Sequence, residues 1–208
     1  MRATPLQFHT SRMGRIVLLA MEEILGQNGL NAVLSLVHIQ DSSSQVPVYD
    51  QEMKFPAEQI SRLQIALESA YGPRAGRGVA QRVGRACLKY GLREFGSELG
   101  VIDSSYRLMP IAKRLERGCE VLAGLINRLT DQHVHYEVDK KHIFWHIERF
   151  PLCLVNLDDG PRNSFLIGLL QEALSWVSGG KYFLVEEKKP VASIDRLCTI
   201  SIDQTPLS

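Results

Sequence analysis

The stretch HVHYEVDKKHIFWHIER, residues 133–149, decides the fold. Apolar and polar side chains alternate in His133–Asp139 and again in Ile143–Arg149, which is the period of a β-strand. The segment Asp139–His142 between them has the length and polarity of a tight turn. The sequence therefore predicts a β-hairpin with one apolar face. The expected cross-strand pairs are Val134 with Ile147, Tyr136 with Trp145, and Val138 with Ile143.

Helical periodicity dominates the chain upstream of this hairpin. The expected helices are Gly14–Gln27, ended by Asn28-Gly29; Leu30–Ile39; a helix from Pro56 to the break at Gly72-Pro73; Ala75–Phe95; and Ile111–Leu129. Downstream, the pattern predicts a helix at Ser164–Val177 and strands at Tyr182–Glu187 and Leu197–Ile202. This order favours an α+β fold with a helical N-terminal half and helices packed on an antiparallel sheet.

Length and composition limit the class of protein. The chain has 208 residues, is 45% hydrophobic and 23% charged, and carries a net charge of +1. These values exclude a disordered chain and a disulfide mini-scaffold, and they predict a single domain over residues 1–208 with a helical extension at 1–55 and a core at 56–203. No apolar run is long enough for a membrane span. The net charge is close to zero and no helix that could read DNA bases is evident, so no nucleic-acid partner is expected. The four cysteines form no CxxC motif, which predicts reduced thiols in a cytoplasmic protein.

Motifs of the common enzyme classes are missing from the sequence. It contains no GxGxxG, GxSxG or HExxH pattern, and the glycines of Gly72-x-x-x-Gly76-x-Gly78 are not followed by the Lys-Ser/Thr of a phosphate loop. The glycine pattern instead indicates a junction where two helices approach closely. We therefore expect a protein that is not a catalyst and holds no cofactor.

Three groups of side chains are candidate sites, each with a plainer alternative. The polar face of the hairpin carries His133, His135, His146 and Glu148, which could bind Zn, Ni or Cu or could form an ordinary solvated face. Arg82, Arg85 and Lys89 recur at helical spacing and could bind an anion or form the solvated face of an amphipathic helix. Five aromatic residues could line an apolar ligand pocket or could form part of an ordinary hydrophobic core. They are Trp145, Tyr136, Phe165, Tyr182 and Phe183.

The C-terminal third resembles a known family. The segments Leu166-Ile-Gly-Leu-Leu-Gln-Glu-Ala-Leu, Lys181-Tyr-Phe-Leu-Val-Glu-Glu and Asp195-Arg-Leu-Cys-Thr-Ile-Ser-Ile are similar to the end of the 4-vinyl reductase domain. The resemblance implies the fold of TRAPP-type tethering subunits and of sensors in aromatic-responsive regulators. It also implies a homodimer with an apolar pocket between helices and sheet, and a role near bacteriochlorophyll synthesis.

The zinc positions of that family are only partly filled in this chain. Glu187 and Cys198 match two of them, whereas Pro190 stands at a third and the fourth falls at Asn163 or Ser164. One thiolate and one carboxylate do not complete a four-ligand site, so the resemblance implies that this zinc site is lost.

Together these observations predict a binding domain for a small, largely apolar molecule, aromatic or tetrapyrrole, that acts as a sensor, carrier or biosynthetic accessory. Trp145, Tyr136, Phe165 and Phe183 are its expected ligand contacts. The alternatives are a tetrapyrrole 4-vinyl reductase that uses a separately bound hydride donor, and an interaction module like the tethering subunits. A homodimer is expected, because the apolar stripe of residues 14–39 exceeds what a small sheet can cover.

Overall fold

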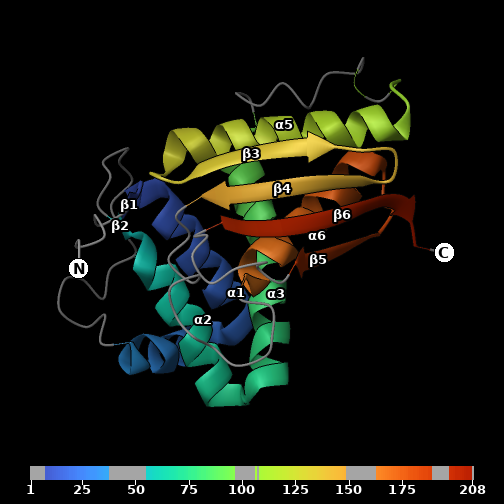
Figure 1. The fold of residues 1–208 in the computed structure, drawn as a ribbon. Helices are drawn as coiled ribbons and strands as arrows, with labels where there is room; N and C mark the ends of the chain where they lie inside the picture. The colour runs from blue at the N-terminus through green and yellow to red at the C-terminus, as the bar shows by residue number, and fades with distance from the viewer. Residues whose placement is uncertain are drawn as a thin grey trace.

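The chain folds into a helical half and a four-stranded sheet, as the computed structural model shows for residues 8–37, 55–96, 106, 108–148, 163–188 and 197–207 (Figure 1). The helices are α1 (Ser11–Leu36), α2 (Ala57–Tyr71), α3 (Pro73–Phe95), α5 (Ile111–Leu129) and α6 (Ser164–Ser178). The strands are β1 (Phe8–His9), β2 (Phe55–Pro56), β3 (His133–Val138), β4 (His142–Glu148), β5 (Phe183–Lys188) and β6 (Leu197–Pro206). The expected α+β class with a helical N-terminal half is confirmed.

The sheet has the strand order β3-β4-β6-β5, and all neighbouring strands are antiparallel. The hairpin register is the one predicted, with Tyr136 opposite Trp145 and His135 opposite His146. Strand β6 is longer than expected and pairs with both β4 and β5. The alternation of the sequence therefore places one face of β3 and β4 in the core and the other face away from it.

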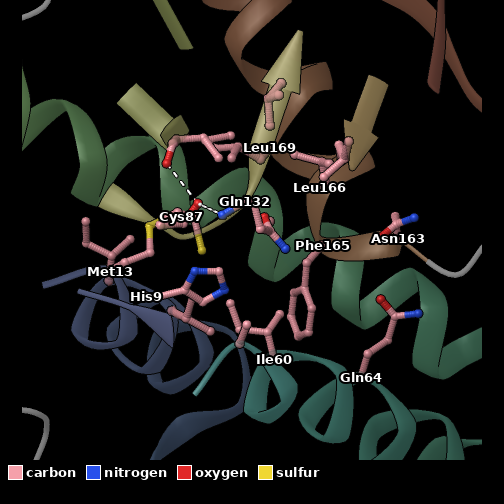
Figure 2. A pocket seen from close by; sticks show the side chains of 18 residues that line it. His9, Met13, Ile60, Gln64, Cys87, Gln132, Asn163, Phe165, Leu166 and Leu169 are labelled. Carbon is pink, nitrogen blue, oxygen red and sulfur yellow. Dashed lines mark hydrogen bonds between the residues drawn. The ribbon is translucent and has the colours of Figure 1, made fainter. Parts of the chain in front are cut away.

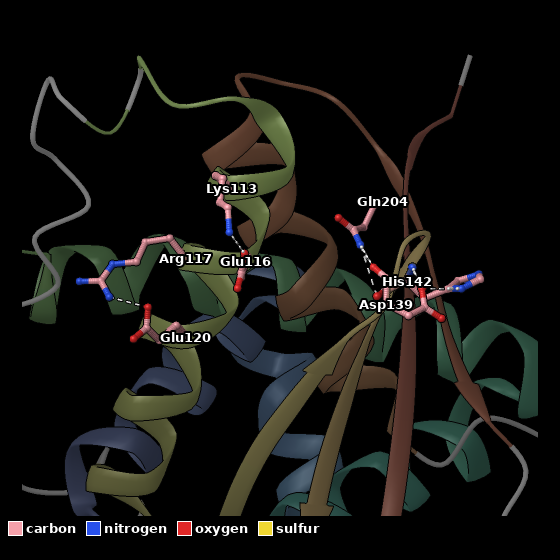
Figure 3. A network of polar contacts seen from close by, with 7 residues as sticks. All are labelled: Lys113, Glu116, Arg117, Glu120, Asp139, His142 and Gln204. Carbon is pink, nitrogen blue, oxygen red and sulfur yellow. Dashed lines mark hydrogen bonds and ion pairs between the residues drawn. The ribbon is translucent and has the colours of Figure 1, made fainter.

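Polar contacts hold the hairpin turn in place (Figure 3). The Asp139 carboxylate accepts hydrogen bonds from the backbone N–H of Lys141 at 2.7 Å and of His142 at 2.6 Å, which lowers the pKa of Asp139. The amide of Gln204 on β6 donates to the Asp139 carbonyl at 3.0 Å. The turn is thus tied to its own strands and to the neighbouring strand.

The core face of the sheet is covered by α5 and α6. Helix α5 packs against β3 and α6, and α6 also packs against β5. Trp145, Leu115 and Leu170 are fully buried in this cluster, together with Ile200 of β6. The opposite side of α5 carries the ion pairs Lys113–Glu116 and Arg117–Glu120 (Figure 3).

The N-terminal helices form a second hydrophobic cluster around α3, which packs against α1, α2 and α6. The structure differs from two expectations about α1. The helix is interrupted at Gly26 (φ 71°, ψ 166°) rather than at Asn28-Gly29. Most of its apolar side chains, such as Leu30 and Val33, are buried or partly buried within the same chain, whereas Leu36 is exposed, so this stripe alone gives little reason to expect a partner subunit. The homodimer stays a prediction without that support.

The beginning of α1 is anchored to the end of α3. Arg12 is buried, forms an ion pair with Glu94 at 2.7 Å, and lies over the ring of Phe95 at 4.4 Å from its centroid. The short pair β1–β2, which the sequence did not indicate, brings His9 opposite Phe55. These contacts fix the first residues of the described chain beside the end of α5, where the Thr10 N–H donates to the Leu129 carbonyl at 2.9 Å.

The α2–α3 junction is a close approach, as predicted. A Cβ on Gly76 would lie 2.5 Å from the Leu67 carbonyl oxygen and from the Glu68 Cα, so only glycine allows the two helices to pack at this distance. Among the described helices, none combines the length and apolar character needed to cross a membrane.

Candidate functional site: an apolar pocket with buried polar atoms

An apolar pocket of about 90 Å³ lies where the helices meet one end of the β3–β4 hairpin (Figure 2). All five helices of the described residues contribute to its wall, for example Ile60 of α2 and Leu169 of α6. Val134 of β3 and Ile147 of β4 form the sheet side. The pocket is therefore lined by segments from most of the described chain.

His9 is a buried imidazole in this pocket. Burial lowers its pKa from 6.5 to about 4, and the nearby Asp131 carboxylate only partly opposes this shift. Its Nδ1 atom is buried and has no hydrogen-bond partner among the described residues. At neutral pH His9 is therefore an uncharged group whose ring nitrogen can bind a polar atom of a ligand.

Gln132 supplies a second buried polar atom from the connection between α5 and β3. Its backbone N–H donates to the Thr130 hydroxyl at 3.1 Å, and this hydroxyl donates to the Ile126 carbonyl at 2.8 Å. The side-chain Nε2 has no hydrogen-bond partner within the described structure. Figure 2 shows the amide directed toward the space between His9 and Phe165.

Asn163, the residue before α6, supplies the third buried polar atom of the pocket. Its Nδ2 donates to Glu187 Oε1 at 3.0 Å and contacts Cys198 Sγ at 2.8 Å, while its backbone N–H donates to Glu187 Oε2 at 3.1 Å. Its Oδ1 is buried without a partner in the described ranges. Asn163, Glu187 and Cys198, which the family resemblance had singled out, thus form a hydrogen-bonded cluster. Of the two candidates for the fourth position, it is Asn163 and not Ser164 that contacts Glu187 and Cys198. Pro190 lies outside the described residues.

Two sulfur-containing side chains, Met13 and Cys87, also line the pocket. Desolvation raises the pKa of the Cys87 thiol to about 12. Because thiolate is the reactive form, this cysteine is a weak nucleophile near neutral pH.

The four aromatic residues expected to contact a ligand occupy two different places. Phe165 lines the pocket. Trp145 and Phe183 are buried in the core between the sheet and α5 and α6, and Tyr136 is partly buried against the same core. The structure therefore brings only Phe165 to this pocket, and ligand contact by the other three stays a prediction.

The predicted anion-binding residues are exposed on α3 and already have neighbours. Lys89 forms an ion pair with Glu23 at 2.8 Å, and Arg85 donates to the Gln171 side chain at 2.8 Å. Arg82 lies on the same exposed face. None of the three lines the pocket, and anion binding by this stripe stays a prediction.

The histidines of the hairpin gather on its outer face as predicted. The rings of His135 and His146 stack with centroids 4.9 Å apart, and His133 lies 5.8 Å from His135. The Nδ1 atom of His146 is 2.9 Å from the Thr199 hydroxyl. Burial and the neighbouring His135 lower the pKa of His146, which Glu137 partly opposes.

Comparison with solved structures places this fold beside the H-NOX proteins. A Cs H-NOX mutant with an unnatural 4-cyano-phenylalanine matches with a TM-score of 0.61 and 14% identity, covering 95% of this chain and 98% of that one. The Fe(II) unliganded H-NOX protein from K. algicida matches with a TM-score of 0.58 and 11% identity, covering 96% and 97%. A point mutant of T. tengcongensis H-NOX matches with a TM-score of 0.57 and 14% identity, covering 94% and 100%. These identities establish a shared fold.

The resemblance to the 4-vinyl reductase family is therefore corrected. Several solved structures that match nearly the whole chain are H-NOX proteins, and no family model matches the sequence. No curated protein matches it either. The short C-terminal segments that suggested the family follow the ordinary pattern of a helix and two strands, which many α+β folds share. The vinyl reductase and tethering alternatives depended on this resemblance and lose their support with it.

Proposed function

We propose that this chain is a small-molecule-binding domain, a sensor or carrier, whose ligand is a compact apolar molecule with one hydrogen-bonding group. The observation that carries the proposal is the set of three buried polar atoms in an otherwise apolar pocket, His9 Nδ1, Gln132 Nε2 and Asn163 Oδ1. A buried polar atom without a partner costs about 1–3 kcal/mol. Three such atoms around one cavity are best accounted for by a ligand that completes their hydrogen bonds.

The polar atoms also indicate which functional group the ligand carries. Gln132 Nε2 is a donor, Asn163 Oδ1 is an acceptor, and neutral His9 can be either at Nδ1. A hydroxyl group matches this arrangement because it accepts one hydrogen bond and donates another. Engineered apolar cavities of about 150 Å³ take up benzene. The cavity of this chain is smaller, about 90 Å³, but it is partly open to solvent, so one ring is the upper limit of the ligand and phenol is the simplest probe that carries a hydroxyl.

The chemistry of the pocket favours binding over catalysis. The titratable side chains among its described lining residues are His9, whose pKa is lowered to about 4, and Cys87, whose pKa is raised to about 12. At neutral pH neither is in its charged form, so the pocket offers neither a thiolate nor an imidazolium to a substrate.

One of the solved structures with this fold was determined in work on heme redox potential and porphyrin distortion, so haem is the first cofactor to test against this pocket. His9, Met13 and Cys87 are residue types that can ligate haem iron. The pocket does not fit the porphyrin ring and the propionates of haem. Its cavity of about 90 Å³ is smaller than a cavity of about 150 Å³ that holds a single benzene ring, and none of the described lining residues is a lysine or arginine that could pair with the propionates. We therefore propose a ligand smaller than haem.

The test compares phenol with toluene, which has a similar shape and no hydroxyl. Calorimetry on the purified full chain should show phenol binding about tenfold more tightly, the worth of one hydrogen bond. Gln132→Leu and His9→Leu should each remove the preference, and Ile60→Trp should block both ligands by filling the pocket.

Gln171→Leu is the matched control, because Gln171 of α6 accepts a hydrogen bond from the exposed Arg85 and is not among the described residues that line the pocket. It should keep the phenol preference. If phenol shows no preference over toluene, or if the preference survives both Gln132→Leu and His9→Leu, the polar atoms do not select the ligand and the proposal fails.

A further inference from the structure

The outer face of the β3–β4 hairpin carries a second cluster that the pocket does not use. Side chains alternate across a strand, so Val134 and Ile147 face the pocket while their neighbours His133, His135, His146 and Glu148 face the other way. The sheet thus separates the two sets of residues.

The register brings the ligand-type atoms of this face together. His133 is directly opposite Glu148, and its Nδ1 lies 3.6 Å from the Glu148 carboxylate. His135 is the next residue on the same face of β3. One donor atom from each of His133, His135 and Glu148 can be chosen so that all lie within 4.8 Å of one another.

From this geometry we propose that His133, His135 and Glu148 bind a first-row divalent cation, with Zn²⁺ as the probe. Zinc–nitrogen and zinc–oxygen bonds are about 2.0–2.2 Å long, so donors of one zinc ion lie about 3–4 Å apart. The donor atoms lie within 4.8 Å of one another, so the widest separation must shorten by roughly 1–2 Å to reach this range. Two imidazoles with one carboxylate favour Zn²⁺, Ni²⁺ or Cu²⁺ over Mg²⁺ or Ca²⁺, which prefer all-oxygen sites.

Neighbouring residues restrict the orientation of the proposed ligand His135. The His135 ring stacks on that of His146, and the His146 Nδ1 is held by Thr199 on β6 at 2.9 Å. This stacking restricts the orientation of His135, in the way that groups behind a metal ligand commonly do. All three proposed ligands project from paired strands rather than from loops, which favours a defined geometry.

The experiment is a Zn²⁺ titration of tag-free full-length protein after chelator treatment and dialysis, followed by calorimetry and elemental analysis. The expected result is one Zn²⁺ per chain, bound at micromolar concentration, with no heat from Mg²⁺. His135→Ala and the isosteric Glu148→Gln should each weaken binding by more than about tenfold.

His142→Ala is the matched control, because His142 belongs to the same hairpin but lies at its opposite end, 3.6 Å from Asp139. It should leave Zn²⁺ affinity unchanged. The proposal is overturned if Zn²⁺ does not bind, if binding survives both His135→Ala and Glu148→Gln, or if His142→Ala weakens it equally. Because Glu148→Gln keeps size and shape, folding of that variant, checked by its circular dichroism, separates loss of a ligand from loss of structure.

Discussion

Gly84 of α3 lies directly against the backbone of Phe165 in α6. A Cβ on Gly84 would lie 2.0 Å from the Phe165 carbonyl oxygen, and a Cβ on Gly168 would lie 2.0 Å from the carbonyl oxygen of Gln81. The two helices therefore meet backbone to backbone, with a glycine from each at the crossing. This contact holds Phe165 and Asn163 at the pocket and joins the helical half to the half that contains the sheet.

Replacing Gly84 with alanine should destabilise the protein strongly. The added methyl group meets backbone atoms that cannot rotate away, so the helices must separate, at a cost of about 3 kcal/mol. Urea denaturation monitored by circular dichroism measures the effect. Gly91→Ala on the same helix is the control: apart from the adjacent residues and the nearby backbone of its own helix, no described atom lies within 4 Å of its added Cβ, and alanine favours a helix over glycine by about 1 kcal/mol. Equal destabilisation by both substitutions would contradict the proposed role of the crossing.

Asn163→Asp should destabilise the fold by about 3 kcal/mol, because it buries a carboxylate beside the Glu187 carboxylate and removes the amide donor. The measurement is the free energy of unfolding in urea near neutral pH. Asn31→Asp makes the same chemical change at an exposed position, where the side-chain oxygen accepts a hydrogen bond from the Gln27 amide, and should change stability little. A stable Asn163→Asp protein would show that the Asn163 amide does not hold the cluster together.

Burial of neutral His9 makes stability depend on pH. The unfolded chain binds this proton with a pKa near 6.5, whereas the folded chain does so only at about 4. Protons therefore favour unfolding, and stability is full above pH 6.5 and falls by up to about 3 kcal/mol as the pH drops toward 4. In His9→Leu this contribution to the loss of stability between pH 6.5 and pH 4 should disappear. Urea midpoints of both proteins at several pH values in this window test it, and parallel curves would argue against the assignment.

Alkylation should distinguish Cys87 in the folded and unfolded chains. Raising a thiol pKa from 9.0 to about 12 reduces its thiolate about a thousandfold near neutral pH, so iodoacetamide should modify native Cys87 far more slowly than the urea-unfolded chain. Mass spectrometry of peptides follows the reaction. Fast labelling of Cys87 in the native protein would mean that the pocket does not desolvate the thiol.

The hairpin was predictable because its information is local. Alternation over residues 133–149 sets the pairing, and the structure has that register. The break in α1 was misplaced because Asn28-Gly29 resembles a helix stop, whereas the positive φ lies at Gly26. Strand β1 has only two residues, too few for any period to be detected.

The pocket could be predicted only in part. Trp145 shares a strand face with Ile147, and this apolar face was rightly expected to meet the helices. Only the end of the face near Val134 and Ile147 reaches the pocket, while the middle, with Trp145, packs in the core between the sheet and α5 and α6. The polar atoms of His9 and Gln132 come from segments more than a hundred residues apart, and no spacing in the sequence links them.

The hairpin that forms one wall of the pocket also carries the histidine cluster on its outer face, and this constrains how the segment can change during evolution. Substitutions can adjust either surface separately, since neighbouring residues face opposite ways. Insertion or deletion of a single residue within β3 would exchange the two surfaces beyond that point, turning imidazoles inward and valine outward. Length changes within these strands should therefore occur in steps of two residues, or be absorbed in the turn at Asp139–His142.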